Sequence, residues 1–267
     1  MLNKVSKCLS MVKDKTPLVQ AITNYVTVTD CANILLSFGA SPAMVEARRE
    51  AEEFIGIASS LYINLGTLTD EQWDAALLAA RRANELKKPV ILDPVAMGVV
   101  SRKVKFVDQL WDYGGAAVIK GNTGEIKSLA GLGGKMRGVD SIDDGDDAIL
   151  ACRIVAQKYN TIAAATGKVD IISDGQNTYL VHNGTPMLTK ITGAGCMVGA
   201  LVAATVGACD EPLAATVAGI MAMGLAGEKA AASFPGILPG TFRVKLFDYI
   251  YSLSAEDMMK EGKLECL

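Results

Sequence analysis

Residues 90–119 have the sequence VILDPVAMGVVSRKVKFVDQLWDYGGAAVI, and this stretch decides the fold. Val90–Leu92 and Ala116–Ile119 are short apolar runs, typical of strands that are buried on both faces. Between them, Lys103–Tyr113 has the apolar spacing of a helix. A strand, a helix and a second strand in this order form a crossover unit with parallel strands. The stretch therefore predicts a parallel sheet covered by helices.

The same alternation continues on both sides of this unit. Further strands are predicted at Leu18–Ile22, Leu61–Leu65 and Thr161–Ala165, and an antiparallel hairpin at Val169–Ser173 and Thr178–His182. Further helices are predicted at Tyr25–Phe38, Asp70–Lys87, Thr123–Ala130, Asp144–Tyr159, Gly195–Gly207, Leu213–Ala232 and Gly240–Ala255. The glycine-rich segment Gly131–Gly138 is predicted to be a loop, and nothing in the sequence divides residues 1–267 into separate domains.

Composition narrows the class of protein. The 267 residues include 26 Lys and Arg against 29 Asp and Glu, and half of the residues are hydrophobic. This apolar content excludes a disordered chain, and the absence of a basic excess argues against nucleic-acid binding. The six cysteines are scattered without metal-ligand spacing, and the first residues lack a signal-peptide core. We therefore expect a compact cytoplasmic protein with free thiols.

An uncharged stretch between Lys190 and Asp210 has nearly the length of a membrane-spanning helix. It is rich in glycine, alanine and threonine, which gain little from contact with lipid. Its glycines gather at the start, where a helix often meets a ligand. The stretch therefore predicts a helix buried within the protein, with no membrane contact.

Polar residues follow three of the predicted strands, at the edge where parallel sheets bind ligands. Asp93 suits Mg²⁺, although an Asp before Pro94 also commonly turns a loop. Lys120 suits a phosphate group. Asn122 and Glu125 have the spacing of a helix capping box, which is an alternative to a metal-binding role for Glu125. Thr166-Gly167 allows close approach of a nucleotide, but it is also an ordinary turn sequence.

The turn Gly193-Ala194-Gly195-Cys196 carries the strongest signal. Its two glycines leave backbone N–H groups free at a helix start, which is an anion site. Cys196 lies at the positive end of that helix, where we expect the thiol pKa to fall. The only histidine, His182, lies on the predicted hairpin and receives no role.

Three other classes of protein fit the motifs poorly. Gly193–Gly199 matches a dinucleotide-binding spacing, but no second parallel strand ending in an acidic residue follows the helix. The sequence contains no P-loop motif. A cysteine hydrolase needs a histidine partner for Cys196, and no supporting pattern surrounds His182.

Taken in order, six segments resemble the hydroxyethylthiazole kinase family of the ribokinase-like superfamily. They cover essentially the whole chain: QAITNYVT (20–27), GASPAM (39–44), LDPV (92–95), IKGNTGE (119–125), ATGKVD (165–170) and ITGAGCM (191–197). Most superfamily members carry Asp where Cys196 stands, and Cys at that position is typical of this family. The resemblance implies a three-layer α/β fold with a mostly parallel central sheet, helices on both faces and no lid domain.

The resemblance also implies an activity and a set of site residues. The reaction would move the γ-phosphate of ATP to the primary hydroxyl of 4-methyl-5-(2-hydroxyethyl)thiazole, with Mg²⁺, in a homotrimer whose active sites lie between subunits. The implied roles are Cys196 as the catalytic residue; Asn24, Met44 and Gly193 in substrate binding; Lys120, Thr166 and Gly195 in nucleotide binding; and Asp93 and Glu125 as Mg²⁺ ligands.

Three alternatives remain open at this point. A hydroxymethylpyrimidine-type kinase or an ATP-dependent nicotinamide-nucleotide repair dehydratase would keep the fold, but would be expected to carry Asp in place of Cys196. A non-catalytic nucleotide sensor would bind ATP without turnover.

Overall fold

The computed structural model describes residues 1–133, 136–137, 140–141 and 145–267. Within them, nine strands form one sheet in the order β11-β10-β9-β8-β5-β4-β3-β1-β2. Their bounds are β1 Leu18–Ile22, β2 Ser41–Ala43, β3 Ser60–Asn64, β4 Val90–Asp93, β5 Val118–Asn122, β8 Ile162–Thr166, β9 Asp170–Ser173, β10 Thr178–Val181 and β11 Leu264–Cys266. The pairs from β2 to β8 are parallel, and β9, β10 and β11 add an antiparallel edge.

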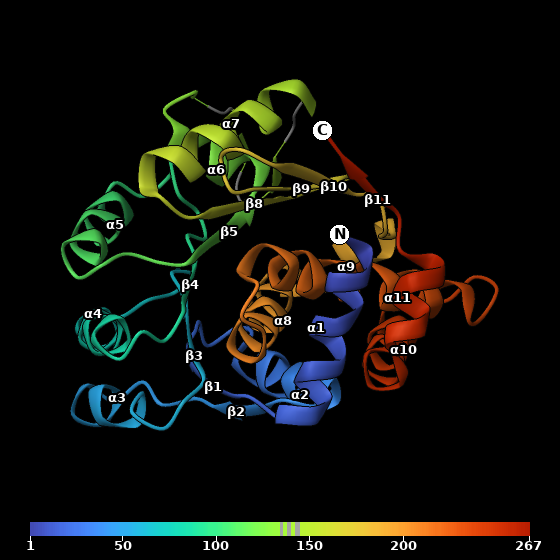
Figure 1. Cartoon of the computed structure of the whole chain (residues 1–267), viewed down its shortest axis with the longest axis horizontal. Coiled ribbons are helices and arrows are strands. Elements are labelled where there is room, and N and C mark those ends of the chain that lie inside the picture. The colour runs from blue at the N-terminus through green and yellow to red at the C-terminus, as the bar shows by residue number, and fades with distance from the viewer. Residues whose placement is uncertain (134–135, 138–139, 142–144) are drawn as a thin grey trace.

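Helices cover both faces of this sheet (Figure 1). One face carries α3 Arg48–Phe54, α4 Asp70–Glu85, α5 Arg102–Asp112, α6 Thr123–Ala130 and α7 Gly145–Tyr159. The other face carries α1 Leu2–Lys15, α2 Val28–Phe38, α8 Ala194–Ala208, α9 Pro212–Ala232, α10 Pro239–Ser252 and α11 Ala255–Glu261. A short 3₁₀ helix, η1 Pro186–Lys190, leads into α8. The predicted three-layer fold is therefore confirmed.

Alternation along each strand divides the buried residues between two cores. Leu61 and Ile63 pack with α3 to α7, whereas Tyr62 packs with α8 and α9. Successive side chains of a strand point to opposite faces, so Asn64 shares the face of Tyr62. The strands β1, β3, β4 and β5 thus present alternate residues to α8, and the last of them on β3, β4 and β5 are polar.

The predicted elements are found with shifts of one to three residues at most ends, and β1 and α6 have the predicted bounds. The sequence did not predict the helices α1, α3 and α11, the edge strands β2 and β11, the short strands β6 and β7, or η1. The α-helices among them are rich in charged residues, and the strands have two or three residues each. The predicted loop Gly131–Gly138 and the start of the predicted helix Asp144–Tyr159 lie partly outside the described residues, next to the antiparallel pair β6 Met136–Arg137 and β7 Asp140–Ser141.

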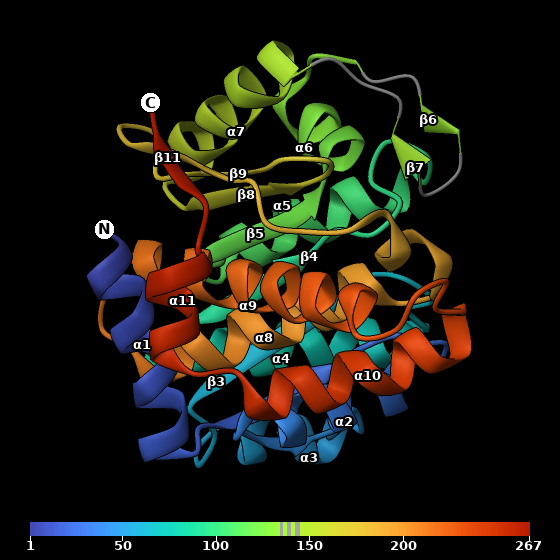
Figure 2. The same ribbon diagram turned by 90° about the vertical axis from the view of Figure 1, so that its right-hand side faces the viewer.

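The helix α8 packs on the sheet against β1, β3 and β4, and α9 lies beside it on the same face, against β8, β9 and β10 (Figure 2). Most of its residues are buried, which confirms the prediction of a buried helix. A Cβ on Gly199 would lie 2.5 Å from the Tyr62 hydroxyl oxygen, and one on Gly219 of α9 would lie 2.7 Å from the Val202 backbone. Glycine at these two positions lets α8 approach both neighbours closely.

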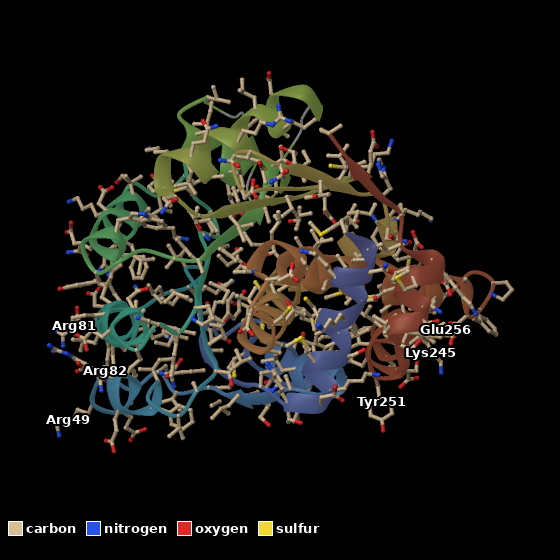
Figure 3. All side chains as sticks on the ribbon, viewed as in Figure 1. Arg49, Arg81, Arg82, Lys245, Tyr251 and Glu256 are labelled. Atoms are coloured by element: carbon tan, nitrogen blue, oxygen red, sulfur yellow. The ribbon has the colours of Figure 1, made fainter. Side chains whose placement is uncertain are left out.

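The helix α9 is long and apolar enough to cross a membrane by composition alone, but 83% of its apolar window is buried inside the protein. It packs against α8, α10 and α1 as a core helix. Charged side chains lie instead at the periphery, where Arg49, Arg82 and Lys245 extend outward from their helices (Figure 3).

We expect Gly199→Ala to lower the free energy of unfolding by about 1–3 kcal/mol, because the added methyl group collides with a buried, hydrogen-bonded tyrosine. The control is Gly240→Ala on α10, where a Cβ meets no atom within 4 Å. Urea denaturation of both variants measures the difference. Equal stability of the two variants would contradict the close approach of α8 to β3.

Candidate active site

The candidate residues gather at the carboxyl ends of the parallel strands. Asn64 pairs with Asp93 across β3 and β4, and Asn122 pairs with Thr166 across β5 and β8. Asn24 follows β1 directly. Because these strands are parallel neighbours, their last residues lie along one edge of the sheet, below the start of α8.

Asp93 and Lys120 form a buried ion pair at this edge, with 3.1 Å between Lys120 Nζ and Asp93 Oδ2. Lys120 Nζ also donates to the Gly195 carbonyl oxygen at 2.9 Å. Burial alone would lower the pKa of Lys120, but the attraction of Asp93, Cys196 and Glu125 outweighs it and the pKa lies above its ordinary value. The lysine is therefore a fixed positive charge directly beneath the glycine turn.

The two carboxylate oxygens of Asp93 differ in their hydrogen-bond partners. Oδ2 accepts from Lys120, from the Tyr62 hydroxyl at 3.0 Å and from Asn64 Nδ2 at 3.1 Å. Oδ1 is buried and has no hydrogen-bond partner among the described residues. A buried carboxylate oxygen without a donor is costly, so it is a strong candidate for contact with a ligand.

The Cys196 sulfur lies against two amide side chains. Asn64 Nδ2 is 3.2 Å and Asn24 Nδ2 is 3.4 Å from Sγ. The Tyr62 hydroxyl also lies 2.9 Å from the backbone carbonyl of Cys196, so its single hydrogen is shared between that carbonyl and Asp93 Oδ2, and Tyr62 ties the start of α8 to β3. Cys196 therefore faces polar groups of the site and is only half-buried.

The expected fall in the Cys196 pKa is wrong. Burial and the nearby Asp93 carboxylate raise the pKa of the thiol above its ordinary value, even though Lys120, Thr27 and Asn24 act in the opposite direction. The position at a helix start was visible in the sequence, but desolvation and the approach of Asp93 arise only in the folded chain. Cys196 is therefore a neutral thiol at neutral pH.

The glycine turn lies at the start of a helix, α8, as predicted. Gly193 precedes α8 with φ of 78°, in the left-handed region that favours glycine, and a Cβ there would lie 2.5 Å from Thr27 Cγ2. The first hydrogen bond of the helix runs from the Met197 N–H to the Gly193 carbonyl at 2.9 Å. The N–H groups of residues 194–196 precede this bond, and such groups at a helix start suit an anion.

Glu125 forms the predicted capping box. Its Oε2 accepts the Asn122 N–H at 2.7 Å, and Asn122 Oδ1 accepts the Glu125 N–H at 2.9 Å. Glu125 Oε1 also accepts the Ala96 N–H at 2.7 Å, which holds the loop after β4. Burial and the Asp93 carboxylate raise the pKa of Glu125 to about 7, so the residue belongs electrostatically to the site as well as to the cap.

Thr166 and Met44 lie at the two ends of the row of strands. Thr166 ends β8, and its hydroxyl donates to the Gly121 carbonyl at 3.2 Å. The next residue, Gly167, donates its N–H to Asp170 Oδ1 at 2.9 Å. Met44 directly follows β2, half-buried against the core that contains α8, and no contact to the other candidate residues is seen.

Sequence reasoning missed Tyr62 and Asn64, which touch both Asp93 and Cys196. The available signal was Asn64 at the end of an apolar strand, the same position that singled out Asp93. It also missed Lys103, whose ammonium donates to the Gly66 and Val95 carbonyls, and whose pKa burial lowers.

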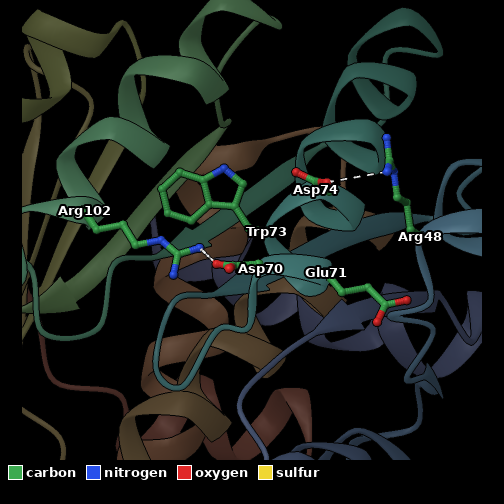
Figure 4. Close-up of a pocket in the computed structure, with 6 residues that line it drawn as sticks. All are labelled: Arg48, Asp70, Glu71, Trp73, Asp74 and Arg102. Carbon is green, nitrogen blue, oxygen red and sulfur yellow. Dashed lines mark hydrogen bonds and ion pairs between the residues drawn. The ribbon is translucent and has the colours of Figure 1, made fainter.

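A separate surface pocket of about 490 Å³ lies where α3, α4 and α5 begin (Figure 4). The pocket is lined by charged side chains and by the Trp73 ring. Arg102 lies over this ring, 4.6 Å from its centre, and pairs with Asp70, while Arg48 pairs with Asp74 at 3.7 Å. None of the predicted site residues lines it. We therefore place the candidate active site at the edge of the sheet below α8, where the described polar network is buried.

The three-layer fold, with a helix-start glycine turn above a lysine and a carboxylate, defines a ribokinase-like small-molecule kinase. A ribokinase-like protein of Enterococcus faecalis aligns with a TM-score of 0.65 at 12% identity, over 91% of this chain and 89% of that one. The pyridoxal kinase of Bacillus subtilis aligns with a TM-score of 0.59 at 18% identity, over 80% and 92%. At these identities the likeness shows the fold alone.

Closer relatives show the family. The model of the hydroxyethylthiazole kinase family matches residues 9–256. A hydroxyethylthiazole kinase of Desulfitobacterium hafniense is 54% identical over the whole of both chains. The structure of the hydroxyethylthiazole kinase protein of Pyrococcus horikoshii aligns with a TM-score of 0.87 at 37% identity, over 98% of each chain. The chain belongs to the hydroxyethylthiazole kinase family, so the predicted family and kinase class are confirmed.

We expect the carboxyl group of Asp170 to make the free energy of unfolding depend on pH. Burial raises its pKa to about 7, whereas an unfolded Asp titrates near 4, so between these values the folded chain holds a proton that the unfolded chain has lost. Its contribution to stability is present below about pH 4 and disappears as the pH rises through about 7.

We expect Asp170→Asn, which keeps an oxygen for the Gly167 N–H, to flatten the fall in unfolding free energy between pH 5 and pH 8. Urea denaturation at four pH values measures it. The control is Asp174→Asn, because hydrogen bonds hold the pKa of Asp174 below its ordinary value despite partial burial. If the unfolding free energy of Asp170→Asn falls with pH as steeply as that of the wild type, the raised pKa of Asp170 is refuted.

Proposed function

We propose that this chain transfers the γ-phosphate of ATP to the primary hydroxyl of 4-methyl-5-(2-hydroxyethyl)thiazole. The observation that carries the proposal is the start of α8, where three amides and the Cys196 sulfur lie beside Lys120 and the free oxygen of Asp93. Phosphoryl transfer requires positioning and charge neutralisation more than covalent chemistry, and this arrangement supplies both.

The nucleotide would lie across the carboxyl ends of β5 and β8. The amides after Gly193 would donate to the oxygens of the transferring group. Lys120, charged and held under Gly195, would meet the phosphates, and Thr166 would contact the nucleotide on the neighbouring strand. Glycine at 195 leaves the turn open above Lys120 Nζ, which would lie 3.4 Å from a Cβ there.

Asp93 and Glu125 fit a magnesium ion bound partly through water. No group of three or more His, Cys, Asp or Glu side chains suited to a metal occurs in the part of the chain that the structure describes. Mg²⁺ commonly uses one or two carboxylates and completes its shell with water and substrate phosphates. The Oδ1 atom of Asp93, which has no hydrogen-bond partner among the described residues, would be available as a ligand for the ion. When bound, the ion would neutralise charge on the phosphates.

Asn24, Met44 and Gly193 would line the thiazole pocket, with Met44 giving it a soft apolar side. Cys196 would hold the acceptor hydroxyl in line with the phosphorus. Because its thiol is neutral, we assign Cys196 a positioning role, and the hydroxyl proton leaves late in a loose transition state.

We further propose a cytoplasmic homotrimer of one-domain subunits with active sites between them. Apolar side chains beside the site support a subunit contact there: Tyr25 is 75% exposed, Val26 50% and Val99 59%. The small negative net charge supports an enzyme that binds neither nucleic acid nor membrane.

Coupled ADP release tests the activity with hydroxyethylthiazole, hydroxymethylpyrimidine and sugars as acceptors. We expect turnover with the thiazole alcohol and little with the others. Preference for hydroxymethylpyrimidine would instead support the pyrimidine-kinase alternative, and ATP binding without turnover would support a nucleotide sensor.

We expect Cys196→Ala to lower kcat by about 10²-fold or more while the Kd of ATP changes by less than about twofold, because the sulfur orients the acceptor and does not contact the nucleotide. Steady-state kinetics and calorimetric titration of ATP measure the two quantities. The matched control is Cys266→Ala, an exposed cysteine on β11. Full turnover in Cys196→Ala would remove the assigned role.

We expect Glu125→Gln to require several-fold more Mg²⁺ for half-maximal rate, with a smaller change in the KM of the thiazole alcohol, since the substitution removes a charge near Asp93. A magnesium titration at saturating ATP measures this. An unchanged titration would leave Glu125 with its capping role alone.

A further inference from the structure

Asn64 is completely buried at the end of β3, and its side chain contacts five other groups. Its oxygen accepts from the Gly66 N–H at 3.0 Å and from Asn24 Nδ2 at 2.8 Å. Its nitrogen lies 3.0 Å from the Tyr62 hydroxyl, 3.1 Å from Asp93 Oδ2 and 3.2 Å from Cys196 Sγ. It is thus the only described residue that hydrogen-bonds to Asn24, Asp93 and Cys196 at once.

The orientation of the Asn64 amide follows from two independent contacts. The backbone N–H of Gly66 can only donate, so it must face the Asn64 oxygen. A carboxylate oxygen can only accept, so Asp93 Oδ2 must face the nitrogen. Both contacts select the same one of the two possible amide orientations.

The orientation of Asn64 then sets that of Asn24. The Asn64 oxygen accepts, so Asn24 must present its nitrogen to it, and the same nitrogen reaches Cys196 Sγ at 3.4 Å. No hydrogen bond to the Asn24 oxygen is found among the described residues, so this oxygen is available to accept from a ligand. Glycine at position 66 lets the backbone approach the Asn24 side chain closely, because a Cβ there would lie 2.9 Å from Asn24 Cβ.

The same amide holds the sulfur. Asn64 Nδ2 has two hydrogens and three acceptors within reach, so it connects the Asp93 carboxylate to Cys196 Sγ in one buried network. Asn24 and Asn64 both direct N–H donors at the sulfur, and the Thr27 side chain hydrogen-bonds to it as well, so protein groups hold the sulfur in place.

We propose that Asn64 is a positioning residue of the phosphotransfer site: its oxygen orients Asn24 to accept from the acceptor hydroxyl, and its N–H groups hold the Cys196 sulfur beside Asp93. The inference rests on the proposed function, since it concerns the same alcohol and the same turn.

A double-mutant cycle tests this in the full-length enzyme, with Asn64→Leu made in three backgrounds: wild type, Asn24→Leu and Cys196→Ala. We expect Asn64→Leu alone to raise the KM of the thiazole alcohol and to lower kcat, each by about tenfold. In Asn24→Leu the further rise in KM should be less than about twofold, and in Cys196→Ala the further fall in kcat should likewise nearly vanish. If Asn64→Leu changes KM in Asn24→Leu and kcat in Cys196→Ala by as large a factor as in the wild type, the proposal is overturned.

Asn64→Asp separates the two contacts and serves if the leucine variant folds poorly. It keeps an oxygen for Gly66 and Asn24 but loses both N–H donors, so KM should stay within about twofold while kcat falls by about tenfold. A rise in KM as large as in Asn64→Leu would contradict the orienting role. The control is Ser60→Ala at the other end of β3, whose buried hydroxyl donates to the Ala203 carbonyl at 2.8 Å; it should lose stability without a change in either constant.

Failure of the proposed function gives a different result. If the wild-type enzyme phosphorylates another alcohol of the acceptor panel and not the thiazole, the cycle is run with that alcohol. If the effect of Asn64→Leu is again smaller in the Asn24→Leu and Cys196→Ala backgrounds than in the wild type, the positioning inference stands. If the effect is equally large in all three backgrounds with that alcohol, the inference is rejected.

Discussion

The close approach of α8 to the sheet is the constraint on which the site depends. Gly199 gives the Tyr62 ring room beneath the helix, and one turn earlier the Cys196 carbonyl meets the Tyr62 hydroxyl at 2.9 Å. The glycine turn is thereby held over Lys120 and the end of β4. A side chain at 199 would lift the helix and separate its first amides from the charges below them.

This arrangement buries polar groups that contribute little to stability. Taking Asp93 and Lys120 out of water is costly, and their attraction offsets that cost only in part. The network around Asp93 Oδ2 is satisfied, but Oδ1 has no donor among the described residues. The stability of the fold comes from the two apolar cores on either side of the sheet, so the polar residues between α8 and the strand ends are explained by chemistry and not by packing.

Local signals predicted the parts of the structure that local interactions determine. The capping box of Asn122 and Glu125, the buried helix after Gly193 and the buried strands all follow from neighbouring residues. The contacts of Asn64 could not be predicted this way, because they depend on the register of β3 against β4 and on the position of α8. The Cys196 pKa was wrongly predicted for the same reason: the helix start is local, whereas burial and the approach of Asp93 come from distant parts of the chain. The helix α1 was missed although its buried Val5, Cys8, Leu9 and Val12 have the apolar spacing of an amphipathic helix.

The charge balance explains why a thiol suits position 196. Asp93 already carries a buried negative charge, and it helps to raise the pKa of Glu125 to about 7. A carboxylate in place of the Cys196 sulfur would be a third acid around one ammonium group, that of Lys120. A neutral thiol adds no such charge, and it accepts weak hydrogen bonds from the two amides that face it. The amides of Asn24 and Asn64 therefore match a sulfur that stays neutral, which agrees with the proposed positioning role of Cys196.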